Sequence, residues 1–215
     1  MKLTADQLDA LTELINIGVG QAAGMLNEMI EFRIQLQVPW LKFLSSSELQ
    51  HELGGRLGKD PLASVQLEFS GSFGGNAQLV FPTDSAATLV EVLTGEESES
   101  PALDELKIGT LTEVGNIVIN GVMGSISNVL TQPIHYDVPN YIEEDIGNLL
   151  PLRDQKSDDK GEFLLAQTRF DIEELHVQGD IILFFNMGSF NALLAAIDNM
   201  AVSYTHLTLP TIYSV

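Results

Sequence analysis

The chain contains no cysteine among its 215 residues. A disulfide framework, a cysteine-ligated metal site and a thiol nucleophile are therefore excluded. Basic residues are also scarce, because 10 Lys and Arg stand against 30 Asp and Glu and the net charge is −20. Nucleic acids and anionic membranes are bound through basic patches, so neither is expected as a partner.

Long apolar runs are absent as well. None approaches the roughly 18 consecutive apolar residues that a membrane-spanning helix requires. The first ten residues, MKLTADQLDA, lack the apolar core of a secretory signal. We therefore expect a cytoplasmic protein with no membrane insertion. Hydrophobic residues make up 45% of the chain, which is enough for a substantial core.

Comparison of the sequence with itself reveals a repeat with an offset of 100 residues. The matched residues are Glu13 with Glu113, Asn16 with Asn116, and Pro39 with Pro139. Each half is predicted to contain a long helix, a β-rich run, two alternating strands and a short helix, in that order. The long helices are expected at residues 4–30 and 102–131.

The alternation of apolar and polar residues predicts the strands. They are expected at 33–44, 63–71 and 75–83 in the first half, and at 133–142, 163–173 and 176–186 in the second. Short helices are expected at 84–95 and 189–200, and a further helix outside the repeat at 45–57. The glycine-rich GSFGGN at 71–76 lies between two strands and is not followed by Lys-Ser/Thr, so it is interpreted as a hairpin turn and not as a phosphate loop.

The repeat predicts one domain over residues 1–200, made of repeats 1–95 and 101–200 with an acidic linker at 96–100. Each repeat alone offers little core. We therefore expect the two to fuse into one body, with strands that pair across or beside a pseudo-twofold axis. Residues 202–215 resemble the translation of a sequencing adapter (VSYTHLTLP) and are predicted not to be native.

The first long helix carries a polar stripe. Asp9, Glu13 and Asn16 fall within roughly 60° of one another at about 100° per residue. The opposite face is predicted to be core: Leu8, Leu11, Ile15, Ala22, Met25, Leu26 and Met29. Small residues, Gly20 and Gly24 among them, continue the stripe. Because glycine costs about 1 kcal/mol inside a helix, they suggest close approach of another backbone.

The second long helix repeats the pair of Glu113 and Asn116, and Asn120, Gly121 and Gly124 follow. An asparagine has no titratable proton and cannot act as a general base, but its amide can orient a water by donating and accepting hydrogen bonds. A carboxylate one turn away can pair with a Lys or Arg of a partner. The pattern suits an enzyme that acts on another protein's phosphate. A solvated or packing face, kept through duplication, is the alternative.

These positions resemble the signature of the CheC/CheX/FliY family of chemotaxis phosphatases, [Asp/Ser]-x3-Glu-x2-Asn-x22-Pro. The first copy is Asp9, Glu13, Asn16 and Pro39, and the second is Gly109, Glu113, Asn116 and Pro139. Two copies resemble CheC most. The resemblance implies an α/β fold of the α+β type, in which a tandem pseudo-twofold repeat carries a largely antiparallel central sheet and two long signature helices.

The resemblance also implies a function in two-component signalling. The chain would hydrolyse the aspartyl phosphate of a phosphorylated CheY-like response regulator. The two asparagines would orient the attacking water, and the two glutamates would pair with the lysine of the receiver domain. Mg²⁺ would belong to the receiver, so no cofactor is expected in this chain. The deamidase CheD is a further implied partner, and an adaptor without turnover is the alternative function. Because Gly109 replaces Asp or Ser, the first site is expected to contribute more than the second.

Overall fold

The computed structural model describes residues 4–58, 60–95, 105–145, 149, 162–186 and 192–198. Its elements in chain order are α1 (Ala5–Ile30), β1 (Gln35–Leu36), β2 (Trp40–Ser45), α2 (Ser46–Leu57), β3 (Leu62–Gly71), β4 (Gly75–Pro82), α3 (Thr83–Thr94), α4 (Glu105–Leu130), β5 (Ile134–Tyr136), β6 (Asn140–Glu144), β7 (Glu162–Ile172), the short 3₁₀ helix η1 (Glu173–Leu175) and β8 (Val177–Asn186). Residues 192–198 are helical. The predicted linker at 96–100 and the tail at 202–215 lie outside the described residues.

The ends of the long helices follow from local chemistry. Thr4 and Gln7 form a capping box at the start of α1, in which each side chain accepts a hydrogen bond from the other residue's backbone N–H, at 3.1 and 3.2 Å. The residues directly after α1 and α4 are Glu31 and Thr131, and both adopt left-handed φ angles, of 59° and 55°. The repeat therefore extends to the backbone conformation that ends each helix.

The strands form one eight-stranded sheet in which every pairing is antiparallel. Its order is β1-β7-β8-β4-β3-β5, with β2 also paired to β7 and β6 to β3. The predicted hairpin turn between β3 and β4 is confirmed. The central pair, β4 and β8, joins one repeat to the other. The short strands β1 and β2 of the first repeat pair with β7 of the second, and β5 and β6 of the second pair with β3 of the first. The expectation of pairing between the repeats is therefore confirmed.

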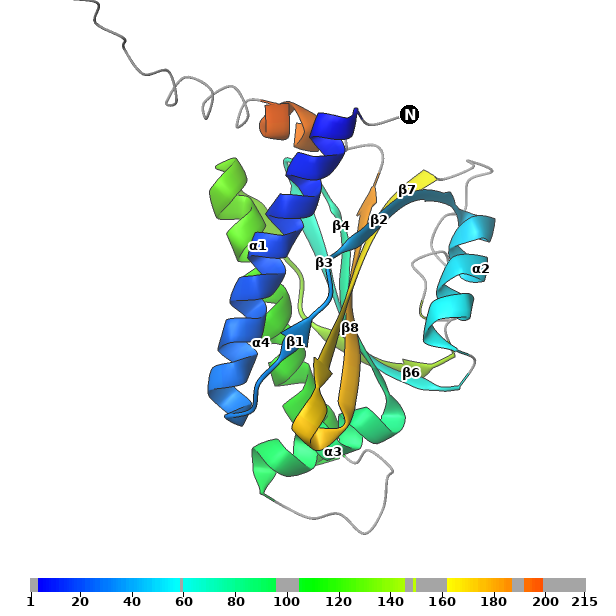
Figure 1. Ribbon diagram of the computed structural model, residues 1–215, viewed down its shortest axis with the longest axis vertical. Coiled ribbons are helices and arrows are strands. Elements are labelled where there is room, and N and C mark those ends of the chain that lie inside the picture. Colours follow the sequence, from blue (N-terminus) through cyan, green and yellow to red (C-terminus); the bar gives the residue numbers. More distant parts are fainter. Residues whose placement is uncertain are drawn as a thin grey trace, which may run out of the picture.

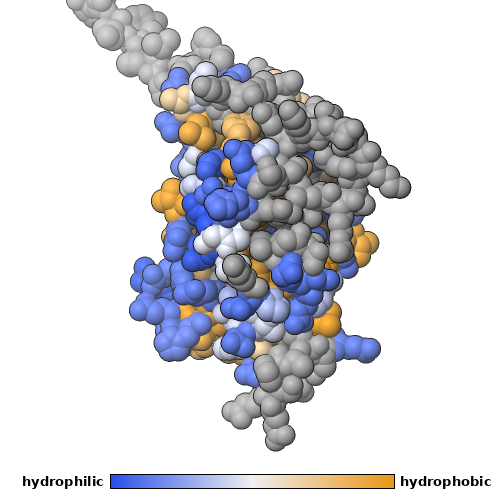
Figure 2. All heavy atoms as spheres, turned by 90° about the vertical axis from the view of Figure 1, so that its right-hand side faces the viewer, coloured by the Kyte–Doolittle hydropathy of each residue, from blue (hydrophilic) through white to orange (hydrophobic). Residues whose placement is uncertain are grey.

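Helices cover both faces of this sheet (Figure 1). The antiparallel pair α1 and α4 packs with α3 on one face, where the larger of two apolar cores lies. The smaller core lies beneath α2 on the other face and includes Leu49, Leu53 and Phe163. Figure 2 shows the α2 side, where polar side chains cover most of the described surface and apolar ones are scattered.

The predicted core face of α1 is only partly correct. Leu11, Ile15, Ala22 and Leu26 are buried. By contrast, the exposed fractions of Leu8, Met25 and Met29 are 40%, 43% and 37%. Helix α1 packs mainly against α4 and not flat on the sheet, so the strip it buries is narrower than the apolar stripe in the sequence.

Candidate active site

Helix α1 presents the first signature on an exposed face. Asp9, Glu13 and Asn16 are all exposed, and each lies about one turn of the helix after the one before it. The residues that follow Glu13, Leu14 and Ile15, are about 1% exposed and anchor the opposite side of the helix in the core. Within the described residues, no hydrogen bond engages the Asn16 amide. A rigid, well-packed helix therefore holds an acid and a free amide out to solvent.

Helix α4 presents the second signature in a different state. Glu113 is exposed like Glu13, whereas Asn116 is half-buried. The Asn120 amide donates a hydrogen bond from Nδ2 to Oδ1 of Asn116, with a length of 2.7 Å. The repeat places Gly20 at the position of Asn120, so α1 offers no equivalent donor.

The first position of the second signature carries no side chain. Gly109 is exposed, and among the described residues no atom from beyond its own turn of helix lies within 4 Å of the place where a Cβ would be. Site two thus lacks any group equivalent to the Asp9 carboxylate. Elsewhere the two helices agree: Thr12 and Thr112 both donate their hydroxyl to the carbonyl four residues earlier, at 2.8 and 2.7 Å.

The first signature proline closes a β-bulge between β1 and β2. Strand pairing on either side shows that Gln37, Val38 and Pro39 lie opposite only two residues of β7, Thr168 and Arg169. Gln37 donates its backbone N–H to the Arg169 carbonyl at 2.9 Å. Proline has no N–H, so it fits where pairing is interrupted.

The second signature proline repeats this geometry between β5 and β6. Asp137, Val138 and Pro139 lie opposite two residues of β3, Leu67 and Glu68, and Asp137 donates to the Glu68 carbonyl at 3.0 Å. In each bulge the valine before the proline is exposed to solvent: Val38 is 74% exposed and Val138 is 86% exposed. Sequence reasoning missed these valines, although the Val-Pro dipeptide recurs at the repeat offset.

The two signatures form separate sites. Helices α1 and α4 run antiparallel (Figure 1). Because Gly121 lies against Ala22, Asn116 is level with about residue 27 of α1. At a rise of 1.5 Å per residue, Asn16 and Asn116 are roughly 17 Å apart along the helix axes. Each site therefore belongs to one helix.

The glycines play different parts from those expected. Close backbone approach occurs at Gly121 and at Gly18, where a Cβ would lie 2.9 Å from the Val122 carbonyl oxygen. At Gly20, Gly24 and Gly124, among the described residues, such a Cβ would meet no atom from beyond its own turn of helix within 4 Å. The prediction for Gly20 and Gly24 is wrong, because both lie on the side of α1 that faces away from the α1–α4 contact.

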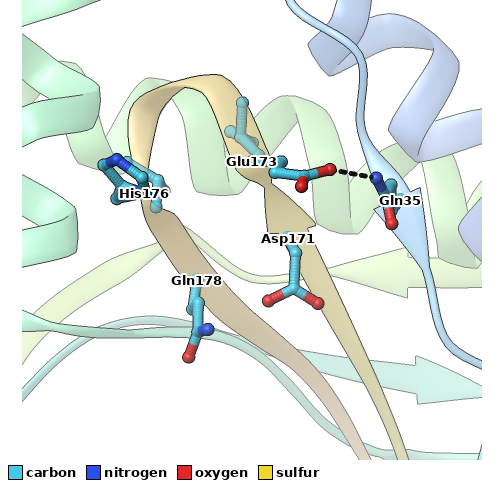
Figure 3. Close-up of a pocket in the computed structure, with 7 residues that line it drawn as sticks. Gln35, Asp171, Glu173, His176 and Gln178 are labelled. Atoms are coloured by element: carbon cyan, nitrogen blue, oxygen red, sulfur yellow. Dashed lines mark hydrogen bonds between the residues drawn. The ribbon is translucent and has the colours of Figure 1, made fainter.

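No signature residue lies in the pocket shown in Figure 3. This pocket has a volume of about 330 Å³ and lies beside the β7–β8 hairpin. Its labelled residues include Asp171, His176 and Glu173, which accepts a hydrogen bond from Gln35 Nε2 at 2.9 Å. Among the described residues, no group of three His, Cys, Asp or Glu side chains could hold a metal ion. The signature face is an exposed helix surface, which favours a macromolecular partner over an enclosed small molecule.

One buried charge was not predicted from the sequence. Asp180 on β8 is 4% exposed and accepts hydrogen bonds from Gln167 Nε2 at 2.8 Å and from an Arg169 guanidinium nitrogen at 3.4 Å. Burial raises the pKa of Asp180, and the Gln167 and Arg169 contacts oppose that effect. Its signal in the sequence is a lone acid within the apolar strand VQGDIILFFN.

Comparison with known proteins agrees with this geometry. The CheC-like family matches residues 7–42, a segment that contains all four positions of the first signature. The CheY-P phosphatase CheC of Bacillus subtilis (strain 168) is 28% identical over 137 residues, which cover 62% of this chain and 65% of that protein. The match thus spans slightly less than two thirds of the relative's own length.

The X-ray structure of Thermotoga maritima FliY has the same fold, with a TM-score of 0.74 at 19% identity, and covers 93% of this chain and 100% of that one. These matches support membership of the CheC/CheX/FliY family. The chain also shares its fold with the crystal structure of a CheX–CheY–BeF3–Mg²⁺ complex from Borrelia burgdorferi, with a TM-score of 0.52, 18% identity, and coverage of 81% of this chain and 99% of that one. Among the described helices, none is both long and apolar enough to cross a membrane.

Proposed function

We propose that this CheC-like chain is a phosphatase that hydrolyses the aspartyl phosphate of a CheY-like receiver domain. The observation that carries the proposal is the exposed pair of Glu13 and Asn16 on one packed helix. The neighbouring helix repeats the pair as an exposed Glu113 and a half-buried Asn116. The names of related proteins support it: a B. subtilis relative is a CheY-P phosphatase, and a CheX with this fold forms a complex with CheY.

Each site would act by positioning. Glu13 or Glu113 would pair with a lysine of the receiver and hold the helix against it. Asn16 or Asn116 would then reach the phosphoryl group and orient a water in line with the bond to the aspartate. The water oxygen bonds to phosphorus, the P–O bond to the aspartate breaks, and free carboxylate and inorganic phosphate result.

The metal in this proposal belongs to the partner. Mg²⁺ in the receiver would neutralise charge on the phosphoryl oxygens, and this chain would supply only the acid and the amide. The exposed face and the strongly negative chain fit a partner that contributes its own cations. CheD as a partner stays a prediction from the family resemblance.

The decisive experiment follows the decay of a phosphorylated CheY-like receiver with Mg²⁺, with and without the chain. We expect faster decay with the chain, and loss of at least about 100-fold of the acceleration in the Asn16→Ala/Asn116→Ala variant, because misplacing a reacting group can cost this much. The matched control, Asn27→Ala/Asn128→Ala, changes exposed asparagines on the same two helices and should keep full activity.

Activity that survives in the Asn16→Ala/Asn116→Ala variant would refute the mechanism. Binding of the receiver with no acceleration by the unmodified chain would instead establish an adaptor. Thermal unfolding of both double variants checks that the comparison is made between folded proteins.

A further inference from the structure

Helices α1 and α4 share the Glu and Asn of the signature but differ beside the signature asparagines. Position 20 is an exposed glycine, which has no side chain to donate a hydrogen bond, whereas position 120 is an asparagine whose Nδ2 donates to Asn116 Oδ1 at 2.7 Å. The result is a free, exposed amide at Asn16 and a half-buried, hydrogen-bonded amide at Asn116.

We infer that Asn120 is a positioning residue for the second site, where it fixes the orientation of the Asn116 amide before a receiver binds. The inference rests on the proposed phosphatase function. In this inference Asn120 does not touch the phosphoryl group or the water. The two sites then differ because the Asn116 amide is oriented in advance and the Asn16 amide is not.

The chemistry of the amide supports positioning over blockage. A carbonyl oxygen has two lone pairs, so Asn116 Oδ1 can accept from Asn120 and still accept from a water. The terminal torsion of a free asparagine is broad and nearly twofold, so either end of the amide can point outward. The hydrogen bond selects one end and leaves Asn116 Nδ2 free to donate.

The pair is poorly explained as a stabilising device. Hydrogen bonds between side chains one turn apart on a helix contribute little to stability. Meanwhile Asn120 Oδ1 is buried and has no hydrogen-bond partner within the described residues, an arrangement that costs stability. Asparagine is also a weaker helix former than alanine. Replacing Asn120 with alanine should therefore leave the unfolding midpoint unchanged or higher.

The experiment isolates each site. In an Asn16→Ala background, turnover of the phosphorylated receiver comes from site two, and we expect Asn120→Ala to lower kcat by about 3- to 10-fold with KM unchanged, because orientation is lost while the docking acid Glu113 remains. In an Asn116→Ala background, turnover comes from site one, and the same substitution should not change kcat or KM. A general loss of structure would lower the turnover of both sites by the same factor.

The outcomes separate the two proposals. Activity in the Asn16→Ala/Asn116→Ala variant would refute the proposed function itself. An inactive double variant together with unchanged site-two kcat in Asn120→Ala would overturn only the role of Asn120. So would an equal loss at both sites, a change in KM alone, or the absence of any site-two turnover in the Asn16→Ala background.

Discussion

Single residues set the two signature helices apart. The Asp9 carboxylate stands on an exposed face of α1, whereas Gly109 leaves the equivalent place on α4 without a side chain. Under the proposed function, the signature of α1 offers a receiver two acids, Asp9 and Glu13, whereas the signature of α4 offers Glu113 alone. The difference in docking thus depends on positions 9 and 109. The difference in amide orientation depends on positions 20 and 120.

The missing carboxylate predicts unequal sites at low receiver concentration. Asn16→Ala should lower kcat/KM more than Asn116→Ala, by about 3- to 10-fold, since one charge-assisted contact is worth roughly 1 kcal/mol or more. Initial rates well below KM measure this. Equal losses in the two single variants would contradict the prediction, and Gly109→Asp should narrow the difference.

Buried Asp180 predicts a particular dependence of stability on pH. Its pKa in the folded chain is raised by burial from the ordinary value of 3.8. Below that value the carboxyl is protonated in both states. As the pH rises through 3.8 and the raised folded value, the unfolded chain releases its proton more readily, and the folded state loses stability.

Asp180→Asn removes this titration. The free energy of unfolding of the unmodified chain minus that of the variant should therefore fall as the pH rises from 3 to 6. Urea unfolding of both proteins at each pH gives the difference directly and cancels the contribution of the other 29 acids. A difference that is flat or that rises with pH would show that burial does not dominate at this site.

At the scale of elements, the contact between α1 and α4 depends on where glycine is placed. A Cβ at Gly18 would lie 2.9 Å from the Val122 carbonyl oxygen, which belongs to a helix backbone and cannot move freely. At Gly20 the same Cβ would meet nothing within 4 Å. Two identical substitutions, two residues apart on one helix, should therefore have opposite effects.

Gly18→Ala should lower the free energy of unfolding by about 1 to 3 kcal/mol through overpacking. Gly20→Ala should raise it by up to about 1 kcal/mol, because alanine is the better helix former. Chemical denaturation of both variants tests the pair. Equal changes would mean that α1 and α4 are not held together at Gly18.

The sequence predicts helices and long strands well, because their periodicity is a local property. The long helices expected at 4–30 and 102–131 are observed at Ala5–Ile30 and Glu105–Leu130. The run expected at 33–44 instead divides into β1 and β2 at the Pro39 bulge. A bulge is defined by the register of two paired strands, so the order of residues in one strand does not reveal it.

Side-chain state was less predictable at the candidate site. The pairing of Glu13 with Asn16 on one face follows from helical spacing, and the structure places both there. The hydrogen bond between Asn116 and Asn120, in contrast, requires a particular rotamer of each side chain. The depth of Asp180 likewise depends on long-range packing, which spacing along the chain does not encode.

At the scale of the molecule, the sheet joins the two repeats at its centre and at both of its edges. Strand β4 pairs with β8 at the centre, and each outer pair contains one strand from each repeat. A single repeat would expose the pairing edges of several strands at once. The sheet of a single repeat would also have only one of the two long helices, α1 or α4, to cover its apolar face.

Residues 1–95 and 101–200, expressed separately, should therefore show no cooperative unfolding transition. Mixed in equal amounts, they should regain the sheet and a single transition. Circular dichroism in increasing urea measures this for each fragment and for the mixture. A cooperative transition in one fragment alone would mean that a repeat can complete its own core.

The hydrogen bonds from Gln7 Nε2 to the Asp198 carboxylate, at 3.2 and 3.3 Å, hold the start of α1 beside the helix at 192–198. Since these two segments are neighbours in space, a short peptide could connect them, and the chain could be opened between Gly95 and Glu105 instead. In such a circular permutant the second repeat would precede the first along the chain, and the same sheet would form. The order of the two halves along the gene is thus free to change without changing the surface that they present together.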